Sequence, residues 1–340
     1  MAISNDILSS PLRVLAREAV DQLFKQLPLL NEIKGKGGVE TIDGGQKIER
    51  PLLLTEHSTI TQLSSGYEPI NLAVSDVLRG ASFEWCDFVA PIVITKKEEL
   101  SNRGPRAIVS IAEARMKSVM GMLQREWELQ AIRGGSTVLT EMLTLSGSNS
   151  TTGFLEATNA VAGQTNDVGG LSKSTFTDLR NQYTDCNAGV QKFSTDGISQ
   201  LTEMYINCQV NSPQGVPNLI LASPTLYRNY KSLLFANERY IGEDTLDGGK
   251  LALAFHSAKM FVDPNLPTGT TGGKAGDQTI SLYALNTDFI KVVFDSDANF
   301  NVTDFENVSG YASRAANVFV RTQLIFDHLK SQGVLGNGED

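Results

Sequence analysis

The sequence lacks the cysteine patterns that define disulfide-rich and zinc-binding proteins. Its three cysteines, Cys86, Cys186 and Cys208, are odd in number and widely spaced, and no Cys-x-x-Cys pair occurs. This spacing excludes a disulfide-framed secreted scaffold and a zinc ribbon. We therefore interpret all three as reduced, mostly buried thiols of a protein made in a cytosol.

An excess of positive charge and a long apolar run are also missing. The chain has 29 Lys and Arg residues against 38 Asp and Glu residues, a net charge of −9. Proteins that hold nucleic acid by neutralising phosphates show a basic patch or stripe, which this chain lacks. A container that faces DNA without gripping it is compatible with this charge. The longest apolar stretch, near Phe88 to Ile94, is far below the roughly 20 residues of a membrane span, and MAISNDILSS has no signal-peptide pattern.

Motifs of known catalytic and cofactor sites are equally missing. The sequence contains no Gly-x-Ser-x-Gly elbow and no phosphate-binding Gly-x-x-x-x-Gly-Lys loop. His57, His256 and His328 have no Cys, His or Glu partner at ligand spacing, so we interpret them as structural or surface residues. We expect no catalytic residue and no cofactor.

The composition is that of a folded protein of 340 residues, with 41% hydrophobic and 20% charged residues. Residues 1–38 are typical of an arm. Pro11 can open a helix that runs to Leu27, and Pro28 with the Gly35-Lys36-Gly37-Gly38 run is expected to end it. One helix cannot form its own core, so this arm must lie on another part of the chain or on a neighbouring subunit.

Residues 39–95 have the alternation of extended chain. In QKIERPLLLT, apolar residues alternate with polar ones, and in ASFEWCDFVAPIVIT the pattern places Phe83, Trp85 and Val89 on one face and Phe88 on the other. The segment SSGYEPINLAVSD between them has a loop composition. A long two-stranded ribbon is marginally stable alone in water, so we expect partner chains to support it.

The strongest helix signal runs from Pro105 to about Arg133. Apolar residues recur at helical spacing up to Trp127, while Glu128 is expected on the polar side. A helix of this length is about 43 Å long at 1.5 Å per residue. The remainder has an α+β pattern. Short elements such as 153–161 lie among loops, followed by helices at 175–185 and 198–210, a strand at 218–222, a helix opened by Ser223-Pro224, and strands within 251–262, 280–295 and 316–335.

This order of elements resembles the major capsid proteins of tailed bacteriophages, which have the Hong Kong 97-type or Johnson fold. The segments that carry the resemblance are VETIDGGQKIERPLLL, FEWCDFVAPIVIT, KKEELSNRGPRAIVSIAEARMKSVMGMLQREWE, NDVGGLSKSTFTDLRNQY, VPNLILASPTLYRNYKSLL and FVRTQLIFDHLKSQGVL. They span nearly the whole chain, and the signal is their sum rather than one diagnostic motif.

The resemblance implies four regions: an N-terminal arm at 1–38, an E-loop at 39–95, a P-domain at 96–175 and 301–322 with its spine helix at about 105–133, and an A-domain at 176–300 and 323–340. It also implies a function. The subunit would form hexamers and pentamers of an icosahedral head that encloses double-stranded DNA, with the E-loop across a neighbour and the A-domain tip near 269–276 at the capsomer axis. The expected location is the virion capsid, assembled in the host cytoplasm, without a membrane.

The resemblance implies further partners, namely a portal, a decoration protein and a scaffolding protein. Some members carry a scaffolding segment ahead of the arm, whereas only about 38 residues precede the E-loop here. We therefore expect either scaffolding from a separate protein or a processed form of the chain, and Met1 favours the separate protein. Two other hypotheses remain. Encapsulin-like bacterial compartments share this fold, and a soluble α+β enzyme with an unrecognised site would show titratable groups clustered in a cleft.

Two candidate chemical sites remain to be located. Some capsids of this fold form a covalent Lys–Asn crosslink through an E-loop lysine, and Lys47 is the only lysine between residues 39 and 95. The stretch DSDANFNVTDFE has the spacing of a calcium-binding loop, with ligand positions at Asp295, Asp297, Asn299, Asn301, Thr303 and Glu306. Phe300 stands where that loop needs glycine, so an acidic turn between strands is the favoured interpretation.

Overall fold

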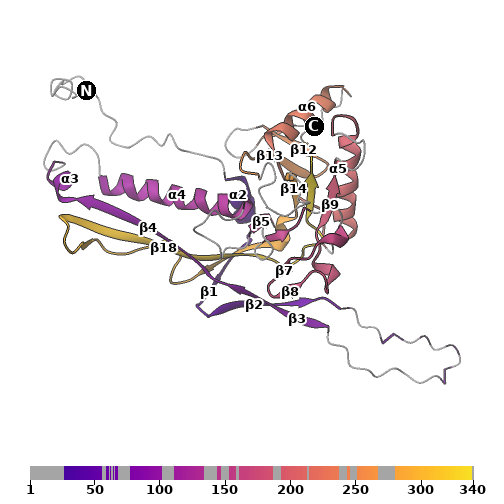
Figure 1. Cartoon of the computed structure of the whole chain (residues 1–340), viewed down its shortest axis with the longest axis horizontal. Helices are drawn as coiled ribbons and strands as arrows, with labels where there is room; N and C mark the ends of the chain where they lie inside the picture. Colours follow the sequence, from indigo (N-terminus) through magenta and orange to yellow (C-terminus); the bar gives the residue numbers. More distant parts are fainter. Residues whose placement is uncertain are drawn as a thin grey trace. The chain divides into compact units, whose positions relative to one another are not determined.

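The structure is a computed structural model. It describes residues 27–55, 59–60, 62, 64, 66–67, 77–101, 111–133, 144–146, 153–157, 161–186, 193–212, 214–236, 243–245, 251–266 and 280–338. The described residues fall into two compact units (Figure 1). Unit 1 contains described residues from Phe88–Arg125 and Phe300–Val320, and unit 2 contains those from Leu27–Asp87, Glu126–Asn299 and Arg321–Asp340.

Unit 1 is built on paired strands and a helix. Strand β4 (Cys86–Thr95) pairs with β18 (Ser313–Phe326), which also pairs with the short strands β16 (Asn301–Val302) and β17 (Glu306–Asn307). Helix α3 (Lys96–Ser101) follows β4, and α4 (Ile111–Arg133) confirms the predicted long helix over its described part; residues 105–110 lie outside the described residues. Both β18 and α4 continue into unit 2.

The alternation predicted along β4 is wrong by one residue. Phe88 is buried at 6% exposure whereas Val89 is 52% exposed, the reverse of the expected faces. The reason lies at Trp85, which separates β3 (Leu78–Glu84) from β4: Trp85 and Cys86 are both buried, so the two-residue period restarts there. A pattern read as one strand is in fact two strands with different partners.

Unit 2 contains a seven-stranded mixed sheet in the order β11-β12-β13-β10-β14-β19-β9. Its strands are β9 (Gln182–Asp185), β10 (Leu219–Ala222), β11 (Glu243–Thr245), β12 (Leu251–Phe255), β13 (Ala258–Val262), β14 (Ile280–Leu285) and β19 (Gly333–Gly336). Helices α5 (Phe193–Val210) and α6 (Pro224–Ala236) pack together, and α5 packs on β9 and β19. Leu201, Met204, Ile220 and Leu335 lie in the resulting core.

The expected helix at 198–210, strand at 218–222 and helix opened by Ser223-Pro224 are confirmed. The expected helix at 175–185 is wrong. A single 3-10 turn, η2 (Thr177–Leu179), is followed there by strand β9, which pairs in parallel with β19. Because β19 lies about 150 residues further along the chain, the pairing that selects the strand is invisible to local periodicity.

The proline predicted to end a helix instead begins one. Helix α2 (Pro28–Gly35) has Pro28 at its first position, where the missing N–H costs no hydrogen bond. Leu29, Leu30 and Ile33 of this helix are buried. The helix predicted from Pro11 to Leu27 lies almost entirely outside the described residues.

Unit 2 also contains a second group of strands. β1 (Val39–Ile42) pairs in parallel with β15 (Ile290–Asp295), which pairs antiparallel with the end of β18. The remaining elements are short: β5 (Thr144–Ser146), β6 (Gly153–Leu155), η1 (Val161–Gly163), β7 (Asp167–Val168), β8 (Leu171–Ser172) and η3 (Thr287–Phe289).

A buried ion pair holds the loops around β6 to β8. The side chain of Lys173 is 0% exposed; its Nζ lies 3.1 Å from Oε1 of Glu156 and donates to the carbonyl of Phe154 at 2.7 Å. The Glu156 carboxylate also accepts the backbone N–H groups of Thr165 at 3.1 Å and Asn166 at 2.9 Å. Burial lowers the pKa of Lys173, and the charge of Glu156 opposes that effect. The cost of burying each charge is offset only while the oppositely charged partner is present.

We expect Lys173→Ala to lower the free energy of unfolding of unit 2 by about 3–5 kcal/mol, because it leaves the Glu156 carboxylate buried without its cation. Chemical denaturation monitored by tryptophan fluorescence measures the change. Lys36→Ala is the matched control, since Lys36 forms an exposed pair with Asp288 at 3.7 Å and should cost less than about 1 kcal/mol. Equal effects of the two substitutions would contradict the structural role given to Lys173.

Candidate interaction surface

The hairpin β2–β3 forms a two-stranded sheet of its own in unit 2. Strand β2 (Lys47–Leu53) pairs antiparallel with β3 (Leu78–Glu84), in a register that runs from Lys47 opposite Glu84 to Leu53 opposite Leu78. Within the predicted E-loop, 39–95, this is the part that forms the hairpin, since β1 and β4 pair elsewhere. Figure 1 shows the hairpin extending from the strands around it in unit 2.

The first anchor of the hairpin is a tight backbone contact at Gly169. The N–H of Ser82 donates to the carbonyl of Gly169 at 3.0 Å. Gly169 has a φ of +56°, and a Cβ placed there would lie 2.8 Å from Cβ of Ala81 and 3.1 Å from the ring of Phe83. Only glycine permits both this conformation and this close approach. The β7–β8 turn thus fixes one edge of β3.

The second anchor involves Trp85 and the strand β18. Nε2 of Gln323 donates to the carbonyl of Glu84 at 2.6 Å, and Nε1 of Trp85 donates to the carbonyl of Gly45 at 3.0 Å. Arg321 lies 5.9 Å from the centre of the Trp85 ring and forms an ion pair with Asp87 at 2.7 Å. Polar contacts therefore fix the chain on both sides of the point where β3 ends.

The third anchor is a network of charges centred on Glu40. Its carboxylate accepts hydrogen bonds from Arg50 of β2 and from Lys291 of β15, the latter at 2.5 Å. Lys291 also lies 3.5 Å from Asp327. Partial burial tends to raise the pKa of Glu40, but the hydrogen bonds from Lys291 and Arg50 hold it below its usual value. The network ties β2 to β1, β15 and the residue that follows β18.

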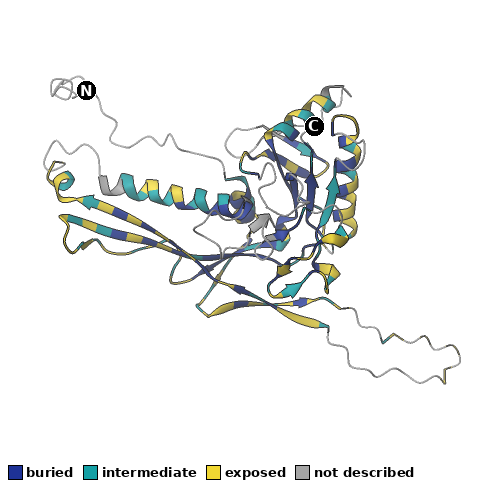
Figure 2. Cartoon of the chain, in the orientation of Figure 1, coloured by how far each residue is buried: buried dark blue, intermediate teal, exposed yellow. Residues whose placement is uncertain are grey.

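Away from its root, the hairpin exposes large apolar side chains. Four such residues lie on the segment from β2 to β3: Leu53 at 71%, Ile60 at 94%, Tyr67 at 97% and Leu78 at 61% exposure. Leu53 and Leu78 stand directly opposite each other. Figure 2 shows the start of β3, away from the root, in the colour of exposed residues. Adjacent exposed apolar side chains such as this leucine pair are a feature of interaction sites.

The two edges of the hairpin differ. The N–H of Leu54 donates to the carbonyl of Val77, whereas the N–H of Ser82 points away from β2. This alternation means that the backbone N–H and C=O groups of residues 51 and 53 point away from β3. The outer edge of β2 therefore carries Pro51, which has no N–H to offer a further strand. At the root of β3 the outward groups bind Gly169 and Gln323.

Lys47, the candidate for a crosslink, lies at the root of the hairpin. Its Nζ is 3.0 Å from Oε1 of Glu84, and the two side chains are 45% and 65% exposed. This is an exposed ion pair at the first residue of β2, far along the strand from Leu53. The crosslink stays a prediction.

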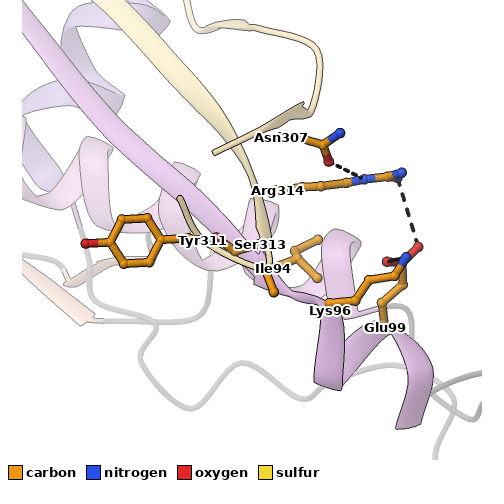
Figure 3. A pocket seen from close by; sticks show the side chains of 8 residues that line it. Ile94, Lys96, Glu99, Asn307, Tyr311, Ser313 and Arg314 are labelled. Carbon is orange, nitrogen blue, oxygen red and sulfur yellow. Dashed lines mark hydrogen bonds and ion pairs between the residues drawn. The ribbon is translucent and has the colours of Figure 1, made fainter. Parts of the chain in front are cut away.

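A hollow of about 260 Å³ lies in unit 1, where β4 ends and β18 begins (Figure 3). It is lined by Ile94, Lys96, Glu99, Asn307, Tyr311, Ala312, Ser313 and Arg314. Lys96 lies 2.7 Å from Glu99, and Arg314 lies 4.0 Å from the same carboxylate. Glu99 is therefore shared by two cations.

The candidate calcium ligands are divided between strand ends and turns. Asp295 ends β15 at 6% exposure, and its carboxylate accepts the N–H of Asp297 at 3.1 Å and lies 3.6 Å from Arg321. Asn301 lies in β16 and Glu306 in β17. Asn299 and Thr303 lie outside strands, and the N–H of Thr303 donates to the carbonyl of Asn317 at 2.9 Å. Phe300 has a φ of +50°, where a calcium loop has glycine. A calcium site stays a prediction, and no group of three or more His, Cys, Asp or Glu side chains suited to a metal occurs among the described residues.

The histidines and cysteines occupy structural positions. His256 lies in the β12–β13 turn with its ring stacked on Tyr205 at 5.0 Å, and Nδ1 of His328 accepts the N–H of Ser331 at 3.3 Å. His57 lies outside the described residues. The three cysteines are buried, as predicted, and burial raises the pKa of Cys186 and of Cys208 to about 12.

In the part of the chain that the structure describes, no helix is long and apolar enough to cross a membrane.

Comparison with solved structures identifies the fold. The chain is similar to the capsid of a GTA particle, at TM-score 0.64 and 11% identity over 98% of this chain and 97% of that one. It is similar to the capsid of cyanophage A-1(L), at TM-score 0.60 and 14% identity over 99% and 100%. It is also similar to the holo-SrpI encapsulin complex from Synechococcus elongatus, at TM-score 0.53 and 10% identity over 93% and 92%. No family model and no curated protein matches the sequence.

The chain therefore has the α+β fold of tailed-phage capsid proteins over nearly its full length, as the sequence resemblance predicted.

We expect Gly169→Ala to destabilise the root of the hairpin more than Gly170→Ala does. Both glycines have positive φ, +56° and +79°, but a Cβ at Gly170 meets nothing within 4 Å. Both substitutions should therefore cost about 1 kcal/mol of backbone strain. The first should cost about 1–3 kcal/mol more through overpacking against Ala81 and Phe83. Thermal denaturation of the two variants measures the difference, and equal melting temperatures would contradict the anchor.

Proposed function

We propose that this chain is a structural subunit that self-assembles into the icosahedral head of a tailed phage around double-stranded DNA. The observation that carries the proposal is the combination of a capsid fold over nearly the whole chain with a hairpin that exposes Leu53, Ile60, Tyr67 and Leu78. A subunit that stayed alone would leave this apolar surface in water.

Self-association removes the cost of leaving apolar surface in water. A two-stranded ribbon alone leaves its apolar face and parts of its outer edges uncovered, whereas a neighbouring subunit can cover the face and the edges. Closed symmetric assembly covers the same surface on every copy, which supports hexamers and pentamers as the units of the shell. The polar anchors at Gly169, Gln323 and Glu40 hold the hairpin in a fixed direction for this contact.

The domain boundaries form part of the proposal. The seven-stranded sheet with α5 and α6 supports an A-domain at 176–300 and 323–340, and α4 with the greater part of β18 supports a P-domain at 96–175 and 301–322. The hairpin supports the E-loop within 39–95. The arm is proposed at 1–38, of which α2 and the residues up to 38 are described. The proposed A-domain tip at 269–276 lies outside the described residues.

The charge of the chain supports a container rather than a nucleic-acid reader. With a net charge of −9, each subunit repels packaged DNA more than it attracts it, so the proposed shell encloses DNA without sequence-specific contacts. We extend the proposal to a separate scaffolding protein, a portal and a decoration protein as partners, to assembly in the host cytoplasm and to a final location in the virion. Catalysis is not part of this function.

The likeness to the SrpI encapsulin complex supports a second candidate, a compartment that encloses protein. The TM-score of 0.53 for that structure is lower than the 0.64 and 0.60 for the GTA and cyanophage capsids. Shells purified from infected cells distinguish the two functions, because a phage head protects DNA from nuclease whereas an encapsulin retains a cargo protein.

We expect the double substitution Leu53→Glu and Leu78→Glu to abolish shell assembly while leaving the fold intact. Two charges would replace the exposed apolar pair at the proposed contact, and neither leucine contributes to the core of its own chain. Negative-stain electron microscopy and light scattering measure assembly, and circular dichroism reports the fold. Wild-type protein, alone or with scaffolding protein, should form capsomers, tubes or closed shells.

Gln62→Glu is the matched control, because it adds a charge to the same exposed segment without removing an apolar side chain. It should assemble as wild type does. A wild-type protein that remains a monomer under all conditions would overturn the proposed function, and normal shells from the double variant would show that this leucine pair is not the contact.

A further inference from the structure

The buried start of helix α2 carries an inference that is independent of assembly. Helix α2 begins without a capping side chain of its own, since Leu27 stands at its N-cap position. The carboxylate of Glu128, on α4, takes that role: Oε1 accepts the N–H of Leu29 at 3.2 Å and Oε2 accepts the N–H of Leu30 at 3.4 Å. Two of the orphan donors of the first turn are thereby satisfied from another helix.

This carboxyl group is buried, and no Lys, Arg or His among the described residues forms an ion pair with it. Glu128 is 2% exposed, and so is Asp263, the residue that follows β13. Oδ1 of Asp263 accepts the N–H of Asn265 at 2.8 Å, while Oδ2 is buried without a hydrogen-bond partner among the described residues. With no neutralising partner in the part of the chain that the structure describes, these two acids are costly to ionise together.

The other charged groups of α2 and of its C-cap residue Lys36 face elsewhere, and Lys34 is exposed. Glu32 pairs with Lys259 of β13 at 3.3 Å, and Lys36 pairs with Asp288 at 3.7 Å. Both are exposed ion pairs, which contribute little to docking. The buried contacts of α2 are therefore its apolar residues, Leu29, Leu30 and Ile33, and the cap supplied by Glu128.

We propose that Glu128 and Asp263 form a proton-dependent latch, which holds helix α2 on unit 2 while the pair retains protons and loosens it as both groups ionise. The latch acts on the chain directly behind residues 1–26, the segment predicted to form most of the arm. It would set how firmly that segment is tethered to its own subunit. No metal, ligand or neighbouring chain is needed for the effect.

The direction of the pH effect follows from the environment of Glu128. Burial raises its pKa from 4.5 to about 8 against the opposing hydrogen bonds from Leu29 and Leu30, and the charge of Asp263 adds to the rise. Burial also raises the pKa of Asp263. In the undocked state Glu128 meets water and ionises normally, so the docked state binds more protons between pH 4.5 and 8. Docking is therefore favoured at low pH and weakens as the pH rises towards 8.

Hydrogen exchange of the α2 amides from pH 5 to 9, corrected for the intrinsic exchange rate, tests the latch. In wild-type protein, we expect the opening equilibrium of the amides of residues 29–36 to rise by up to about tenfold per pH unit between about pH 5 and 8, if opening releases one proton. Glu128→Gln retains a carbonyl acceptor but cannot ionise, so most of this dependence should disappear. Asp263→Asn should shift the steep region to lower pH.

Glu32→Gln is the control, because it removes the exposed pair with Lys259 and leaves the buried acids unchanged. It should keep the wild-type pH dependence. The latch is overturned if Glu128→Gln exchanges with the same pH dependence as wild type. It is also overturned if calcium ions restore protection of the wild-type amides at pH 9, which would make the pair a cation site. Both readouts come from a single chain, so they are independent of whether shells form.

Discussion

A two-stranded ribbon has no interior, and this constraint shapes the hairpin β2–β3. At its root, Ala81 and Phe83 are buried because the β7–β8 turn and Phe154 supply the missing layer. Beyond the root no described part of the chain supplies a layer, and Leu53 and Leu78 remain in contact with water. Burial of these two leucines against another molecule would gain about 25 cal/mol per Å² of apolar surface.

The anchoring of the hairpin is polar, whereas its distal surface is apolar, and this division has a physical reason. Hydrogen bonds and ion pairs, such as those of Glu84 with Gln323 and of Glu40 with Lys291, are directional and fix an orientation. Apolar contacts are non-directional and adapt to a neighbour of the right shape. In the proposed assembly, the hairpin needs directional polar contacts at its base to fix its orientation. It needs apolar contacts at its end to pack against another copy of the chain.

The sequence predicted the elements with strong local signals and failed where distant contacts decide. The long helix and the helix at 198–210 follow from apolar periodicity and glycine or proline boundaries. Strand β9 was missed because its partner β19 lies far along the chain, and the phase of β4 was missed because Trp85 and Cys86 are both buried. The exposed leucine pair could be predicted only in part, since alternation indicates a strand but the register sets which residues face each other.

Glu128 shows the same limit most clearly. Helical spacing places it on the polar side of α4, yet it is 2% exposed, because helix α2 packs over that side and presents two N–H groups there. A glutamine in its place would satisfy a donor without the cost of burying a charge. The carboxyl group adds something that an amide cannot, namely a proton that can leave. Because Asp263, whose charge raises the pKa of Glu128, is also an acid, the local electrostatics favour retention of that proton and couple the docking of α2 to pH.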